Sequence, residues 1–173
     1  RQVDGILWAA PEIGNNHAWV DERIEKIPVP VIFIAMRPRD GIPSVATDNF
    51  QGAVMAIQHL LDCGRKKIGH ISGPLDWWEA IERKRGWFES IKMAGLEPLA
   101  QHCVEGNWSP SSGEQAFDQL LGAFPNMDAV FVANDQMALS VLREACRRGI
   151  KIPEQLAVVG FDGIPESAYF YPS

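Results

Sequence analysis

Residues 129–138 of the 173-residue sequence read Ala-Val-Phe-Val-Ala-Asn-Asp-Gln-Met-Ala, and this stretch indicates the fold class. Its first five residues form an unbroken apolar run, which is typical of a strand buried on both faces of a sheet. Two polar residues, Asn134 and Asp135, come next, and apolar side chains at helical spacing follow them. A strand that leads through a short polar turn into a helix is the repeating unit of α/β proteins.

The same unit recurs along the chain. Further apolar runs predict strands at residues 5–8, 31–34, 68–72 and 157–161, with a weaker candidate at 103–108. Helical patterns lie between them, at 20–27, 51–61, 81–94, 110–121 and 138–148. This alternation predicts an α/β fold with doubly wound parallel sheets and helices on both faces of each sheet.

Glycines and serines predict where the helices end and begin. The glycines that follow apolar helical stripes, and are expected to stop them, are Gly64, Gly95, Gly122 and Gly149. Ser109 with Pro110 is typical of an N-cap and first helical residue, although Ser111 with Glu114 would fit a capping box instead.

Residues 37–48 interrupt the alternation, because Pro38, Gly41 and Pro43 punctuate them. We expect this segment, with a short extended piece at 44–47, to cross between two lobes. The predicted lobes are residues 1–48 and residues 49–173. The first has two strands and one helix, too few for a complete sheet, so we expect a chain that is incomplete at both ends.

Composition excludes several classes of protein. Hydrophobic residues make up 46% and charged residues 22% of the chain, as in soluble globular proteins. No apolar run approaches the roughly 20 residues of a membrane-spanning helix, so we expect no membrane contact. The net charge is −6, and residues 76–173 hold 8 basic and 14 acidic residues. Such a surface does not attract nucleic acid, so DNA binding is not expected within this chain.

No pattern of a catalytic, cofactor or metal site is present. The chain lacks a phosphate-binding glycine loop, a dinucleotide-binding glycine motif and a nucleophile elbow. The four histidines are scattered, without metal-ligand spacing. The three cysteines, Cys63, Cys103 and Cys146, are expected to be reduced thiols. We therefore expect neither an enzyme nor a cofactor.

Ligands of open α/β sheets bind at the carboxyl ends of the strands, so the residues that follow each strand are the candidates for a binding site. They include Trp77, Trp78, Trp108, Asn134 and Asp162, with Arg83 on the helix that begins after Trp78. Each has a structural alternative. Asn134 and Asp135 are also common helix caps, Asp162 precedes a glycine as in many turns, and one tryptophan of the pair at 77–78 can lie in the core.

These residue types suit a sugar. The apolar face of a pyranose stacks on an indole ring, and its hydroxyls both donate and accept hydrogen bonds. Aspartate accepts from two adjacent hydroxyls, arginine donates with a planar fork, and asparagine does both. A few polar groups in an aromatic-lined cleft are typical of small-molecule sites.

The motifs of the chain, in order, resemble one family. They include Val3-Asp4-Gly5-Ile6-Leu7, Asp48-Asn49-Phe50-Gln51-Gly52-Ala53, His59-Leu60-Leu61, Ile71-Ser72-Gly73-Pro74, Arg83 with Gly86-Trp87, Asn107-Trp108-Ser109, Val132-Ala133-Asn134-Asp135-Gln136-Met137-Ala138-Leu139, Gly149-Ile150 with Ile152-Pro153, and Val158-Val159-Gly160-Phe161-Asp162. Over essentially the whole length the chain resembles the effector-binding core of LacI-type bacterial transcription regulators, which have the two-lobed fold of type I periplasmic binding proteins.

The resemblance implies a sugar effector between the lobes. Arg83, Asn134 and Asp162 would bind its hydroxyls, and Trp108 would stack on its ring. Gln51 falls where some members place an acidic contact. The pair Trp77-Trp78 resembles members that sense plant-derived sugars or oligosaccharides.

The resemblance also implies partners and a location. It predicts a cytoplasmic homodimer that pairs partly through residues 137–148, and a repressor whose operator DNA is bound by an N-terminal helix-turn-helix outside this sequence. The alternative is an exported solute-binding protein of a sugar transporter, against which three unpaired cysteines argue. The sequence leaves open which sugar binds, whether it induces or co-represses, which operator is recognised, and whether the assembly is a dimer or a tetramer.

Overall fold

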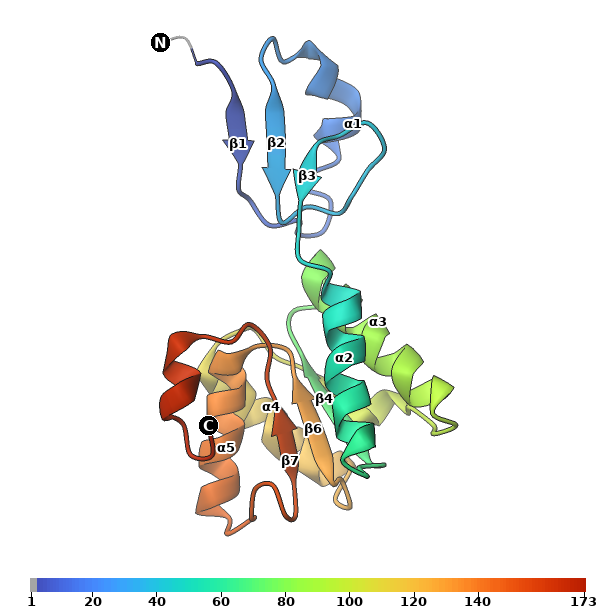
Figure 1. Cartoon of the computed structure of the whole chain (residues 1–173), viewed down its shortest axis with the longest axis vertical. Coiled ribbons are helices and arrows are strands. Elements are labelled where there is room, and N and C mark those ends of the chain that lie inside the picture. Colours follow the sequence, from blue (N-terminus) through green and yellow to red (C-terminus); the bar gives the residue numbers. More distant parts are fainter. Residues whose placement is uncertain (1–2) are drawn as a thin grey trace.

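The computed structural model describes residues 3–173, which form two parallel sheets in separate lobes (Figure 1). The first sheet has the order β1-β2-β3, with β1 (Ile6–Trp8), β2 (Val31–Ile34) and β3 (Ser44–Val45). The second has the order β5-β4-β6-β7, with β4 (Ile68–Ser72), β5 (Cys103–Glu105), β6 (Ala129–Val132) and β7 (Ala157–Val159). The predicted α/β class with parallel sheets is confirmed.

Helices connect the strands. The α-helices are α1 (Trp19–Arg23), α2 (Asn49–Asp62), α3 (Trp78–Met93), α4 (Pro110–Ala123) and α5 (Asp135–Arg147), and the 3-10 helices are η1 (Ile24–Lys26), η2 (Ala100–His102) and η3 (Pro165–Tyr169). The α-helices and η1 lie within a few residues of the helical patterns that the sequence predicts, whereas η2 and η3 were not predicted.

The second lobe has a core on each face of its sheet. Because successive strand residues face opposite ways, Val130 and Val132 of β6 pack with α4 and α5, whereas Phe131 packs with α2 and α3. Figure 1 shows these two helix pairs on opposite sides of the sheet. The buried His70 stacks between Trp87 and Phe131, with ring centroids 5.6 and 4.8 Å away.

The predicted helix ends hold with one exception. Ser109 is the N-cap of α4, and its hydroxyl accepts a hydrogen bond from the Ser112 amide, so the N-cap interpretation is correct and the capping box is not formed. Gly122 does not stop α4, which continues to Ala123. The reason is that Phe124 packs against the core beyond it, and the chain therefore turns only there.

The first lobe departs from the prediction that its strands are buried on both faces. In β2, Val31 and Phe33 are buried, but Ile32 and Ile34 are each 40% exposed. Val20 of α1 packs on the buried face. Within residues 3–173 no element covers the other face, so this apolar run is only half-buried.

Two connections join the lobes. The chain passes from β3 to α2 through residues 46–48, and residues 12–14 lie against residues 76–78 of the second lobe. There Ile13 and Trp77 form an antiparallel bridge, the Gly14 amide donates to the Asp76 carbonyl (2.7 Å), and the Trp78 amide donates to the Glu12 carbonyl (3.1 Å). We propose the boundary between residues 48 and 49, because β3 ends at Val45 and α2 begins at Asn49.

Candidate functional site

The strand order of the second lobe creates a crevice. From β4 the chain moves to β5 on one side and later to β6 on the other, so the connections diverge above the neighbouring strands β4 and β6. Ligands of open α/β sheets bind at such a switch point, outside the carboxyl ends of the strands. A cavity of about 460 Å³ lies there, which we call the switch-point cavity. Its lining residues are Trp77, Glu79, Arg83, Trp108, Asn134, Gln136 and Asp162.

The cavity brings together five of the seven predicted site residues: Trp77, Arg83, Trp108, Asn134 and Asp162. The other two lie elsewhere. Gln51 is exposed on α2 and does not line the cavity. Trp78 is 8% exposed and lines a different cavity, described below. Whether the five contact a ligand remains a prediction.

Two indoles form an aromatic wall. Trp77 and Trp108 meet edge to face, with ring centroids 5.8 Å apart. Trp108 follows β5 in a left-handed backbone conformation (φ 70°), and its six-membered ring lies against Gly73. A Cβ on Gly73 would come within 2.1 Å of that ring, so only glycine lets the indole approach the end of β4. The indole Nε1 of Trp108 is buried and has no hydrogen-bond partner in the part of the chain that the structure describes.

Arg83 reaches the cavity from α3 and is held on several sides. Its Nε donates to Asn49 Oδ1 (2.8 Å), Nη1 donates to the Ala133 carbonyl, and Nη2 lies 3.7 Å from Asp162 Oδ1. The guanidinium lies 3.8 Å from the Phe161 ring centroid. Burial lowers the pKa of Arg83, and the nearby Asp162 opposes that shift. The result is a fixed cation at the floor of the cavity.

Asn134 caps a helix and also holds the aromatic wall. Its Oδ1 accepts from the Met137 amide at the start of α5 (3.0 Å), and its Nδ2 donates to the Trp108 carbonyl (3.0 Å). The capping interpretation is therefore correct. The side chain still retains one N–H and one lone pair, because an amide offers two donors and two acceptor sites.

Asp162 sits in a strained loop that Asp135 holds in place. Its φ is 104°, in the left-handed region that favours glycine. Asp135 Oδ2 accepts from the amides of Gly163 (2.8 Å) and Ile164 (2.9 Å). The capping interpretation is wrong for Asp135, because Asn134 is the N-cap and Asp135 is the first residue of α5; its carboxylate instead fixes the turn that carries Asp162. Burial raises the pKa of Asp162, whereas Arg83 lowers it.

Glu79 is a lining residue that the sequence analysis missed. It lies in the first turn of α3, and its Oε2 is buried with no hydrogen-bond partner among residues 3–173. Burial raises the pKa of this carboxyl, whereas its own backbone amide and nearby Arg83 lower it. The rule that pointed to Arg83 would have found Glu79, had it been applied to the whole first turn of the helix after β4. The same holds for Gln136 after β6.

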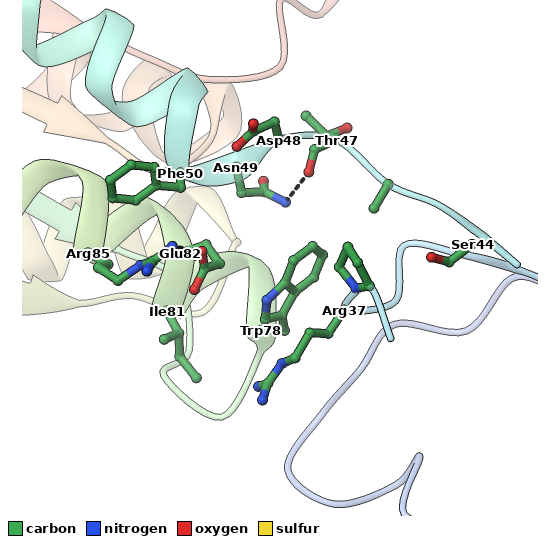
Figure 2. Close-up of a pocket in the computed structure, with 12 residues that line it drawn as sticks. Arg37, Ser44, Thr47, Asp48, Asn49, Phe50, Trp78, Ile81, Glu82 and Arg85 are labelled. Atoms are coloured by element: carbon green, nitrogen blue, oxygen red, sulfur yellow. Dashed lines mark hydrogen bonds and ion pairs between the residues drawn. The ribbon is translucent and has the colours of Figure 1, made fainter. Parts of the chain in front are cut away.

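A larger cavity of about 800 Å³ lies where the crossing segment meets α3, and we call it the hinge cavity. Figure 2 shows Arg37, Thr47, Asn49 and Trp78 around it. Asn49 Nδ2 donates to the Thr47 carbonyl (3.1 Å), while its Oδ1 accepts from Arg83. The buried Asn49 amide therefore links the floor of the switch-point cavity to the segment that joins the lobes.

Other kinds of site are not evident among residues 3–173. From residue 3 to residue 173, no helix is long and apolar enough to span a membrane. Over the same described residues, no group of three or more histidine, cysteine, aspartate or glutamate side chains is arranged to hold a metal ion.

Comparison with known proteins identifies related chains. The family of periplasmic binding protein-like domains matches residues 57–173. Catabolite control protein A of Priestia megaterium is 35% identical over 99% of this chain and 52% of its own length. The HTH-type transcriptional repressor PurR of Edwardsiella ictaluri is 30% identical over 100% of this chain and 51% of its own length. The chain thus spans about half the length of the curated relatives it matches.

A solved structure extends the likeness to three dimensions. A sugar-binding transcriptional regulator of the LacI family from Escherichia coli, complexed with phosphate, superimposes with a TM-score of 0.90. It is 27% identical in sequence, and the match covers 97% of this chain and 60% of that one. Both lobes and their arrangement are therefore shared.

Proposed function

The chain belongs to the family of periplasmic binding protein-like domains and matches LacI-type regulators, so we propose that it is the sugar-sensing part of a transcription regulator. The observation that carries the proposal is the switch-point cavity. Two indoles, a fixed guanidinium, two amides and two carboxylates converge there from four segments of the second lobe.

The cavity chemistry fits a sugar better than a wholly apolar ligand. The aromatic wall offers an indole face for the C–H side of a pyranose. Asp162, Asn134 and Glu79 supply acceptors or donors for hydroxyls at its edge. A solved relative is described as sugar-binding, which supports this choice. We infer a role in binding without catalysis, since the relatives are regulators.

Binding would act through the two connections between the lobes. Trp77 lines the cavity and also pairs with Ile13 of the first lobe. Arg83 is bonded to Asn49, which in turn holds Thr47 of the crossing segment. A ligand that prefers one angle between the lobes would shift the population toward it.

In the intact protein, the change in the angle between the lobes would alter DNA binding. Because the relatives are about twice as long as this chain, and PurR is named as an HTH-type transcriptional repressor, we propose that operator DNA is bound by a segment outside residues 1–173. We also propose that the protein works as a cytoplasmic homodimer. The acidic second lobe agrees with this division, since its charge would repel a phosphate backbone.

The test measures operator affinity of the intact protein by mobility shift, with and without a panel of mono- and disaccharides. We expect one sugar to change that affinity by about 5- to 150-fold, the usual range of allosteric coupling. Trp108→Ala should lose the sugar response and keep DNA binding. Phe88→Ala, an exposed aromatic of α3 outside the cavity, is the matched control and should keep both. An intact protein that binds no DNA, or whose DNA binding no sugar alters, would disprove the proposal.

A further inference from the structure

The charged side chains that line the switch-point cavity carry more negative than positive charge. Two carboxylates, Glu79 and Asp162, and one guanidinium, Arg83, line it. Arg83 and Asp162 face each other at 3.7 Å and offset each other. Glu79 has no such partner among residues 3–173, and its Oε2 is buried without a hydrogen bond. A ligand in this cavity therefore meets one uncompensated carboxylate.

Arg83 is poorly placed to receive an anion. Two of its nitrogens donate to Asn49 and to the Ala133 carbonyl, and the third lies toward Asp162. Phe161 covers the guanidinium at 3.8 Å from its ring centroid. An anionic ligand would have to displace one of these partners, and the displaced oxygen would then lie buried beside the new negative charge.

The helix N-termini near the cavity are also unfavourable positions for an anion. Helices α3 and α5 both begin at this edge, and a helix N-terminus ordinarily attracts negative charge. Each carries a carboxylate in its first turn, Glu79 in α3 and Asp135 in α5. Glu79 lines the cavity and places the negative charge of the protein itself at the start of α3. At α5 the Met137 amide is already bonded to Asn134 Oδ1, and the Asp135 carboxylate is bonded to the turn at Gly163 and Ile164.

We propose, resting on the sugar-binding function above, that Glu79 is a specificity-determining residue: it selects an unphosphorylated sugar, uncharged or bearing an amine, and rejects sugars with an anionic group. A hydroxyl or ammonium group donates to the free carboxylate in a charge-assisted hydrogen bond. A phosphate brings negative charge into a partly buried site, where repulsion between like charges is much stronger than in water.

The experiment compares three probes that share one ring and differ in charge: glucose, glucosamine and glucose 6-phosphate. Their affinities for the intact protein are measured by isothermal titration calorimetry. We expect glucosamine to bind most tightly and glucose 6-phosphate at least about tenfold more weakly than glucose. Glu79→Gln keeps the size of the side chain and removes its charge, so it should close most of the gap between glucose and glucose 6-phosphate and remove the advantage of glucosamine.

Glu82→Gln is the matched control. It removes the same charge from the same helix, but Glu82 pairs with Arg85 and lines the hinge cavity, so the order of the three affinities should not change. Glucose 6-phosphate binding as tightly as glucose, or a Glu79→Gln ratio within about twofold of wild type, would overturn the selective role while leaving sugar sensing intact. Failure of all three probes to bind would overturn the selectivity assigned to Glu79 for this ring, whereas sugar sensing itself is judged by the panel of mono- and disaccharides above.

Discussion

The two lobes use similar apolar strands to different effect. In the second lobe every residue of β4 is buried, whereas in the first lobe β2 alternates between buried and exposed residues. Both strands are central in their sheets. The difference lies in what packs on them, since two pairs of helices sandwich the second sheet and α1 covers one face of the first. Burial is thus a property of the surrounding layers and cannot be read from the strand alone.

The largest expected effect compares two isoleucines. Ile71 of β4 is fully buried and Ile32 of β2 is 40% exposed. Ile71→Ala should lower the free energy of unfolding by about 2–5 kcal/mol, because it removes buried methyl groups and leaves a cavity. Ile32→Ala should cost less than about 1 kcal/mol. Urea unfolding of the 173-residue chain measures both, and repeating it on the intact protein asks whether another segment covers Ile32. Equal losses in the short chain would contradict the comparison.

Glycine-to-alanine substitutions compare how tightly the backbone is packed in the two lobes. Gly73→Ala places a Cβ within 2.1 Å of the Trp108 ring and should cost about 1–3 kcal/mol, as overpacking does elsewhere. In the first lobe a Cβ on Gly5 would lie 3.4 Å from the Pro30 carbonyl oxygen, an ordinary contact, so Gly5→Ala should be nearly neutral. Thermal unfolding separates the two variants. A neutral Gly73→Ala would mean that the indole wall is loosely packed.

Acid should destabilise the second lobe through His70. Burial lowers the pKa of this imidazole from 6.5 to about 3, so between these values the unfolded chain binds a proton that the folded chain does not. The stability contribution therefore falls as pH decreases, by about 2 kcal/mol at pH 5 relative to neutral pH. The free energy of unfolding, measured by urea denaturation from pH 7 to 5, should therefore depend less on pH in His70→Leu than in the wild type. His17→Leu in the first lobe is the comparison variant and should keep most of the slope.

The smallest expected effect is a gain. Gly122 lies inside α4 with open space around it and without a left-handed φ. Gly122→Ala should stabilise the second lobe by about 0.5–1 kcal/mol, because alanine favours the helix. A rise in the melting temperature checks it. A loss would indicate that the end of α4 needs glycine, as the sequence analysis assumed.

Much of the fold could be predicted from the sequence because strand limits coincide with changes of polarity. Strands 31–34 and 68–72 are predicted with their observed limits, since Pro30 precedes the first run and Lys67 and Gly73 flank the second. The five predicted residues that line the switch-point cavity come from one rule, that ligands meet the carboxyl ends of strands. Those rules depend on local order along the chain, and local order is visible in a single sequence.

The remaining features depend on direction and on neighbours. Trp77 and Trp78 are adjacent, but Trp77 lines the switch-point cavity and Trp78 lines the hinge cavity. No local sequence pattern determines where the first turn of α3 begins, so this difference could not be predicted. Gln51 lies at a position matched only by resemblance, and α2 presents it to solvent. The half-exposed strand β2 was misjudged because its covering layer could not be counted from its own residues.

The separation between the cavity lining and the connections to the first lobe also matters for re-engineering. A library randomised at residues 79 and 108 would vary the surface of the switch-point cavity. It would leave unchanged Trp77, which pairs with Ile13, and Asn49, which bonds to Arg83 and to the Thr47 carbonyl. Ligand recognition could then be altered separately from the response of the lobes, as a tunable biosensor requires.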